Sequence, residues 1–139
     1  MRLEVSTSIA APPERVWQMI VDVERWHEWT VSITSIEKLT PGDLRVGSKA
    51  RVKQPKLPPT AWTVTSLDPG RSFEWEAKGP GSRTVAWHRA EPEGDGARAT
   101  LGIDQQGIFF ALTGWYFDKL TREYLNTELA GLKRRAEGE

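Results

Sequence analysis

Apolar and polar side chains alternate along residues 2–9, which read Arg-Leu-Glu-Val-Ser-Thr-Ser-Ile, and this period of two predicts a half-buried strand. The period changes immediately afterwards, because Val16, Trp17 and Ile20 recur at helical spacing behind a pair of prolines. Proline suits the first helical turn, since the N–H it lacks would find no partner there in any case. A helix this short is marginal alone, so its apolar side is expected to pack against a sheet.

A second short helical piece is predicted around residues 23–29, and the period of two then returns. Turns rich in glycine and proline separate the later segments, and the three prolines of residues 55–59 exclude that loop from the interior of a sheet. The predicted strands cover residues 31–39 (whole or broken), 47–54, 61–67, 72–78, 84–90 and 97–105. Successive strands with one polar and one apolar face describe an antiparallel meander that is solvated on one side.

The pattern becomes helical from about Ile108 and stays so to Ala136. Gly114 interrupts the first part, which places the expected start of the helix nearer residue 113 or 115. One broad stripe recurs at spacings of three and four and comprises Phe110, Thr113, Phe117, Leu120, Tyr124 and Thr127. The order of strand, two short helices, about six strands and one long helix predicts a single α+β domain over residues 1–139, in which a curved sheet of six to seven strands grips the C-terminal helix.

Composition narrows the range of functions. Nineteen basic and nineteen acidic residues cancel, so neither nucleic acid nor an anionic membrane is an expected partner. No apolar run approaches the roughly 20 residues that span a bilayer, and the first residues do not fit a signal peptide, so a cytoplasmic protein is expected. The chain has no cysteine and its two histidines lie far apart, which leaves no set of metal ligands. The chain has no glycine-rich nucleotide-binding loop, so no cofactor is expected. It also has no serine-nucleophile motif.

Three motifs resemble the helix-grip superfamily of START lipid-transfer domains, bacterial polyketide cyclase/dehydrases and birch-pollen-allergen-like proteins, also called SRPBCC proteins. Residues 11–29 run from Ala-Pro-Pro-Glu-Arg-Val-Trp through Asp22 to Trp29 and are similar to the family's APxxVW…D…W opening. Residues 62–75, with Trp, Leu-Asp-Pro and Phe-Glu-Trp, are similar to its central hairpin. Residues 88–96 place His-Arg and Glu-Pro before the Gly-Asp-Gly turn that precedes the last strand. The chain resembles the bacterial polyketide cyclase-like members most.

The resemblance implies a deep cavity between the concave face of the sheet and the long helix, which in such proteins receives apolar or aromatic small molecules. The inward strand positions agree, because small residues there leave volume unfilled: Ala50, Ala77, Ala86, Ala97 and Ala99. We therefore expect binding of a hydrophobic or aromatic ligand such as a lipid, a polyketide or an isoprenoid-like molecule. Two alternatives stay open, namely a polyketide cyclase/aromatase-type enzyme that uses the same cavity and a co-chaperone-like protein-interaction module.

The candidate ligand-binding residues are His88, Tyr124, Trp29, Trp62, Trp75, Phe117 and Leu120. The tryptophans could form the walls of a pocket or, equally, a bulky core, because seven tryptophans are many for a domain of this size. Tyr124 shares a helical stripe with Phe117, so it is expected to face the sheet with its hydroxyl at the rim. Apolar residues around Trp115 could border an entrance or form a homodimer contact.

His88 is the candidate with the widest chemical scope. If Arg83 and Arg89 face water, strand parity turns His88 toward the concave side of the sheet. Its imidazole could there bind a ligand oxygen, or act as acid or base near neutral pH. The alternatives are a core histidine hydrogen-bonded to a neighbour, and an outward-facing histidine with Trp87 inside. No residue is assigned as catalytic from the sequence.

Overall fold

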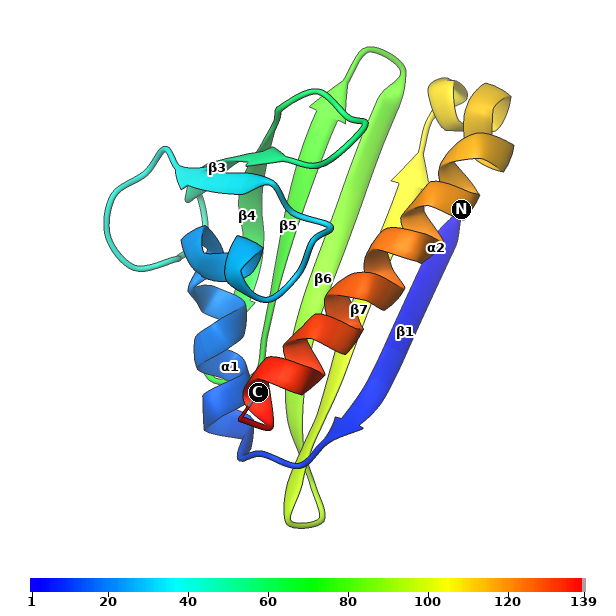
Figure 1. Ribbon diagram of the computed structural model, residues 1–139. Coiled ribbons are helices and arrows are strands. Elements are labelled where there is room, and N and C mark those ends of the chain that lie inside the picture. The colour runs from blue at the N-terminus through cyan, green and yellow to red at the C-terminus, as the bar shows by residue number, and fades with distance from the viewer. Residues whose placement is uncertain (139) are drawn as a thin grey trace.

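Seven antiparallel strands form one twisted sheet, and a long helix crosses its inner face diagonally (Figure 1). The structure is a computed structural model and describes residues 1–138. Its elements in chain order are β1 (Arg2–Ile9), α1 (Pro13–Val21), the 3-10 helix η1 (Val23–Glu28), β2 (Ser35–Lys38), β3 (Lys49–Lys53), β4 (Thr60–Asp68), β5 (Ser72–Gly79), β6 (Ser82–Glu93), β7 (Gly96–Gln106) and α2 (Ile108–Ala136). The strand order β1-β7-β6-β5-β4-β3-β2 places the first strand beside the last and makes the others a meander.

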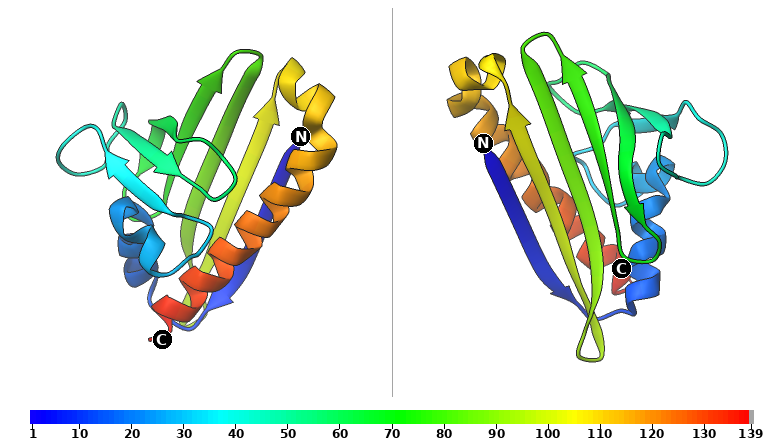
Figure 2. Two further views of the ribbon diagram at one scale, coloured as in Figure 1. Left: turned by 45° about the horizontal axis from the view of Figure 1, so that its top comes forward. Right: turned by 180° about the vertical axis from the view of Figure 1, so that it is seen from behind.

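The sheet has one buried face and one face toward solvent, as the alternation along the strands predicts. In β5, Phe73, Trp75 and Ala77 are buried, whereas Glu74 and Glu76 alternate with them on the opposite face. Seen from behind, the strands lie in front of α2 (Figure 2), so the helix covers the inner face. The predicted α+β architecture of a sheet that grips a long C-terminal helix is confirmed.

The N-terminal elements occur in the predicted order, but one of them is shorter. α1 begins at Pro13 as expected, and its buried side is formed by Val16, Trp17 and Ile20. The strand expected over residues 31–39 is reduced to β2. Thr30 and Ser32 are instead buried in the preceding turn, where their hydroxyl oxygens lie 2.7 Å apart in a hydrogen bond. Residues 31–34 therefore belong to this turn, although Val31, Ile33 and Thr34 are of a type that favours strands.

α2 begins at Ile108, earlier than the expected residue 113 or 115. Gly107 has a φ of 104°, which lets the chain leave β7 and enter the helix within one residue. The backbone N–H of Phe109 then donates to the carbonyl of Gly81 at 2.8 Å, which ties the start of α2 to the β5–β6 turn. Gly114 lowers helix propensity but does not end the helix, because the segment is already fixed at its start.

The second half of α2 holds the helix against the rest of the protein. Its buried residues are Leu120, Thr121, Leu125, Glu128, Leu129, Gly131, Leu132 and Ala136. The closest approach is at Gly131, where a Cβ atom would lie 1.9 Å from the backbone oxygen of Trp29. Only glycine leaves room for this contact between α2 and the corner that follows η1.

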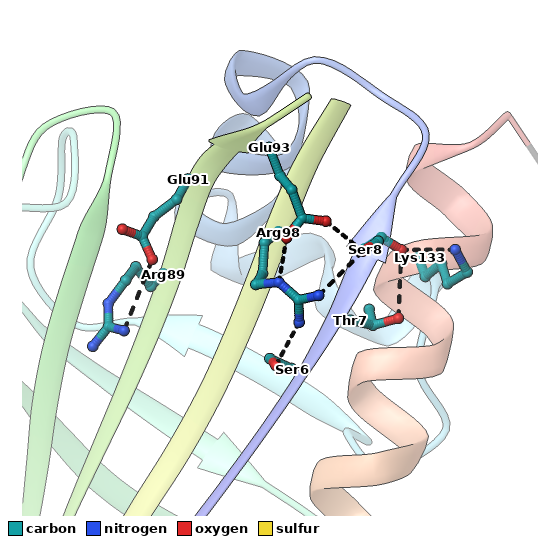
Figure 3. A network of polar contacts seen from close by, with 8 residues as sticks. All are labelled: Ser6, Thr7, Ser8, Arg89, Glu91, Glu93, Arg98 and Lys133. Carbon is teal, nitrogen blue, oxygen red and sulfur yellow. Dashed lines mark hydrogen bonds and ion pairs between the residues drawn. The ribbon is translucent and has the colours of Figure 1, made fainter. Parts of the chain in front are cut away.

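Polar side chains fix the end of α2 as well. Arg15 of α1 donates from Nε to the backbone oxygen of Ala136 at 2.7 Å and from Nη2 to that of Arg135 at 3.1 Å. These are carbonyls that the last turn of a helix leaves without intrahelical partners. Lys133 donates from Nζ to the backbone oxygen of Ser8 at 2.7 Å, beside a network of charged residues at the ends of β1, β6 and β7 (Figure 3). The C-terminal end of α2 is thereby joined to α1 and β1.

Two glycine substitutions in α2 test this close contact. Gly131→Ala is expected to lower the free energy of unfolding by about 1–3 kcal/mol, because the added methyl group displaces α2 from the Trp29 carbonyl. Gly114→Ala is the matched control, since among residues 1–138 no atom outside the adjoining helix backbone lies within 4 Å of a Cβ there. Alanine should raise the free energy of unfolding at this position by up to about 1 kcal/mol. Urea unfolding measures both, and effects of the same sign and size would contradict the proposed contact.

Candidate functional site

A cavity of about 620 Å³ lies between the inner face of the sheet and α2. Several aromatic side chains line it, among them Trp26, Trp62, Trp75, Phe109, Phe110 and Phe117. Residues of β3 to β7, of α2 and of the loop before β4 complete the lining. The volume falls within the range of pockets that hold drug-sized molecules, and such pockets are also mostly apolar.

The cavity exists because the inward positions of the central strands carry small side chains. Ala77 of β5 and Ala86 of β6 line it, together with Thr84. Ala97 and Ala99, which are also predicted to leave volume free, instead belong to the packed core. Space therefore remains opposite the first half of α2, where residues 108–119 include no buried side chain.

The open side of the cavity is marked by lining residues that are themselves exposed. They come from the loop before β4 (Pro58 and Pro59), from the β5–β6 turn (Pro80) and from the start of α2 (Phe109). Beyond Phe109, an exposed apolar surface on α2 is formed by Ile108, Leu112 and Trp115, of which Trp115 is 81% exposed. Part of the region expected near an entrance thus borders the cavity, while Trp115 faces solvent.

Six of the seven candidate residues line the cavity, namely His88, Tyr124, Trp62, Trp75, Phe117 and Leu120. They come from β4, β5, β6 and α2, which the antiparallel order and the helical stripe bring together. The seventh, Trp29, is not among the described residues that line it. Trp29 is buried in the corner after η1, with its ring 5.8 Å from that of Trp26 and its backbone oxygen beneath α2. The structure thus places Trp29 in the packed core next to Gly131, and the other six candidates along the cavity.

Trp26, which was not among the candidates, lines the cavity. Its indole N–H donates to the backbone oxygens of Ile20 at 3.0 Å and Met19 at 3.2 Å, which are carbonyls at the end of α1. Its ring packs 5.7 Å from Trp75 and 5.2 Å from His88 between ring centres. The tryptophan whose N–H binds the last carbonyls of α1 thus also forms part of the cavity wall.

His88 points inward as strand parity predicts, and it is only 5% exposed. Its ring stacks on Phe73 with centres 4.3 Å apart, and Nδ1 lies 3.4 Å from the backbone oxygen of the same residue. Burial lowers the pKa of His88 to about 3, against a weaker opposing effect of the Phe73 carbonyl. The imidazole is uncharged at neutral pH, so it suits hydrogen bonding to a ligand and does not suit the proton donation considered from the sequence.

Glu128 is the site residue that the sequence analysis missed. It lines the cavity from α2, is 7% exposed, and has neither a hydrogen bond nor an ion pair within the described chain. Burial raises the pKa of its carboxyl to about 8. Helical spacing could have identified it, because Glu128 lies four residues after Tyr124 and three after Leu125 and therefore shares the face of the helix that meets the sheet.

Other polar side chains also line the cavity, among them Gln105, Thr121 and Tyr124. Gln105 donates from Nε2 to the hydroxyl of Thr121 at 3.0 Å, which links β7 to α2, and its Oε1 is buried without a partner among residues 1–138. The Tyr124 hydroxyl donates to the backbone oxygen of Pro55, and burial raises the pKa of this phenol. Tyr124 therefore lies at the rim and joins α2 to the loop before β4.

Across residues 1–138, no three histidine, cysteine, aspartate or glutamate side chains are grouped so that they could hold a metal ion. In the same part of the chain, no helix combines the length and the apolar character needed to cross a membrane.

The protonation of Glu128 predicts a pH dependence of stability. Its carboxyl titrates near 4.5 when exposed and near 8 in the fold, so the folded protein binds this proton more tightly. The corresponding stability is complete below pH 4.5 and is lost as the pH rises to 8. Glu128→Gln should gain stability over the wild type across this interval, by up to about 5 kcal/mol at its upper end. Urea unfolding between pH 5 and pH 8.5 measures the difference, and parallel profiles would exclude a buried neutral Glu128.

The comparisons with known proteins agree with this architecture. The family model described as "Polyketide cyclase / dehydrase and lipid transport" matches residues 1–137. No curated protein matches the chain.

Solved structures that share the fold are distant in sequence. TTHA0849 from Thermus thermophilus is 22% identical with a TM-score of 0.80, and the match covers 98% of this chain and 97% of that one. The di-domain ARO/CYC protein BexL of the BE-7585A biosynthetic pathway is 16% identical with a TM-score of 0.77, covering 99% of this chain and 46% of that one. Ara h 8.0201 is 11% identical with a TM-score of 0.76, covering 100% of this chain and 99% of that one. The fold is therefore the expected helix-grip fold, and the chain belongs to the polyketide cyclase/dehydrase and lipid transport family of SRPBCC proteins.

Proposed function

We propose that the protein reversibly binds a hydrophobic or aromatic small molecule in the cavity between the sheet and α2. The observation that carries this proposal is a cavity of about 620 Å³ whose lining is mostly apolar and includes several aromatic side chains. A lipid, a polyketide or an isoprenoid-like molecule has the apolar character that these walls suit. Among the polar residues that line the cavity, His88, Tyr124 and Glu128 are the ones that we propose to orient the ligand.

Burial of apolar surface supplies the driving force. A ligand that buries about 300 Å² of apolar surface gains roughly 7 kcal/mol before the costs of association are subtracted. The uncharged state of His88 favours this, because a buried imidazolium would have to be paired or solvated. Residues 108–119 of α2 contribute little to the packed core, so a ligand can fill the space beneath them at little cost in existing contacts.

Catalysis of the polyketide cyclase/aromatase kind in the same cavity is the second candidate, and Glu128 favours it. A carboxyl with a pKa near 8 remains protonated at neutral pH and can donate a proton to a bound substrate. His88 lacks this ability at neutral pH because it is already uncharged. The enzyme would thus use Glu128 as its acid and the aromatic walls to fold a flexible chain.

Filling the cavity tests the binding proposal. Thr84 faces the cavity from β6, so Thr84→Trp should occupy part of its volume and weaken binding of Nile red, a neutral apolar dye, by at least about tenfold. Fluorescence titration of the dye measures this directly. Unchanged affinity in Thr84→Trp would place the dye elsewhere and contradict the proposal.

The neighbouring residue provides a matched control. Arg83 lies on the outer face of the same strand, paired with Glu76 at 2.7 Å, so Arg83→Trp adds the same side chain outside the cavity. We expect its affinity for the dye to stay within about twofold of the wild type. Circular dichroism establishes that both variants retain the fold before their affinities are compared.

A further inference from the structure

Glu128 gives the cavity a carboxyl group that no protein side chain neutralises. The residue is 7% exposed, lines the cavity, and forms no ion pair or hydrogen bond with the rest of residues 1–138. A buried carboxyl without a partner is costly, and such groups are usually paired or hydrogen-bonded. The missing partner is one that a ligand can supply.

The charged groups around the cavity decide which ligand charge it can accept. Lys78 is the one lysine or arginine among the described lining residues, and its side chain is 68% exposed and paired with Glu76 at 3.5 Å on the outer side. His88 is uncharged at neutral pH. Among the described lining residues, the interior therefore offers the carboxyl of Glu128 but no cation that could receive an anionic ligand.

The aromatic rings of the cavity also favour a positively charged ligand. Trp26, Trp62 and Trp75 form a connected group, with successive ring centres 5.7 and 5.6 Å apart. The faces of such rings attract ammonium groups, and the attraction is strongest where water is excluded. A carboxyl and several indole rings in one cavity are therefore complementary to a ligand that is both apolar and positively charged.

Building on the proposed binding function, we propose that the ligand is a hydrophobic amine whose ammonium group pairs with the Glu128 carboxylate inside the aromatic cavity. As the ammonium enters, Glu128 releases its proton to solvent, so the cavity holds one negative and one positive charge. The charge-assisted hydrogen bond between them offsets the removal of both groups from water. Carboxylate ligands such as fatty acids should bind more weakly, because the described lining residues place no cation inside the cavity to receive them.

Three probes that share a naphthalene ring test this inference: 2-naphthylmethylamine, 2-naphthalenemethanol and 2-naphthoate. The affinity of each probe is measured by its displacement of Nile red at pH 8. At this pH Glu128 is about half ionised and an alkyl amine is still protonated. We expect the amine to bind about tenfold more tightly than the alcohol, and the carboxylate to bind more weakly than both. Equal affinities of amine and alcohol, or tighter binding of the carboxylate, would overturn the inference.

Glu128→Gln keeps the shape of the side chain and removes its charge, so the affinities of the amine and the alcohol should become equal to within about twofold. Glu123→Gln, an exposed position on the same helix, should retain the advantage. An amine advantage that survives in Glu128→Gln would overturn the inference.

The wild-type comparison of the three probes stands even if that variant does not fold. If neither the dye nor any probe binds the wild type, the binding function itself fails, whereas binding without preference overturns the amine inference alone.

Discussion

The close contact between Gly131 and the carbonyl of Trp29 determines how α2 lies on the sheet. The absence of a side chain at Gly131 lets the helix reach the corner that follows η1, and Arg15 then binds the carbonyls of the last helical turn. The helix is held firmly at this end, while residues 108–119 contribute no buried side chain. A long helix that is tied to the sheet at its start and packs against the core only through its second half can span a cavity instead of closing it.

The chemistry of that cavity follows from the same arrangement. Burial that is sufficient to keep His88 uncharged also keeps Glu128 protonated, so two titratable groups face the interior without charge at neutral pH. The walls around them are aromatic, and Trp26 contributes to the wall while its N–H caps the end of α1. Trp26 thus takes part both in the packing of the N-terminal helices and in the wall of the cavity.

Much of this could be predicted from the sequence, because strand parity and helical spacing are strong constraints. The two arginines that flank His88 in β6 fix its inward direction, and the stripe through Phe117 and Tyr124 fixes the face of α2 that meets the sheet. Trp29 could not be placed, since its position depends on a contact with a glycine about a hundred residues away. Glu128 was overlooked because a carboxylate on an amphipathic helix usually marks the solvated edge, and its burial depends on the sheet opposite.

The central claim is that the interior cavity, and not the exposed apolar surface of α2, receives the ligand. The indole N–H signals in a ¹H–¹⁵N spectrum test it directly during titration with 2-naphthalenemethanol, because the tryptophans occupy different sites. We predict that the signals of Trp62 and Trp75, which line the cavity, shift with added ligand while that of Trp115 stays in place. A shift of Trp115 alone, or unchanged signals of Trp62 and Trp75 at saturation, would contradict the account.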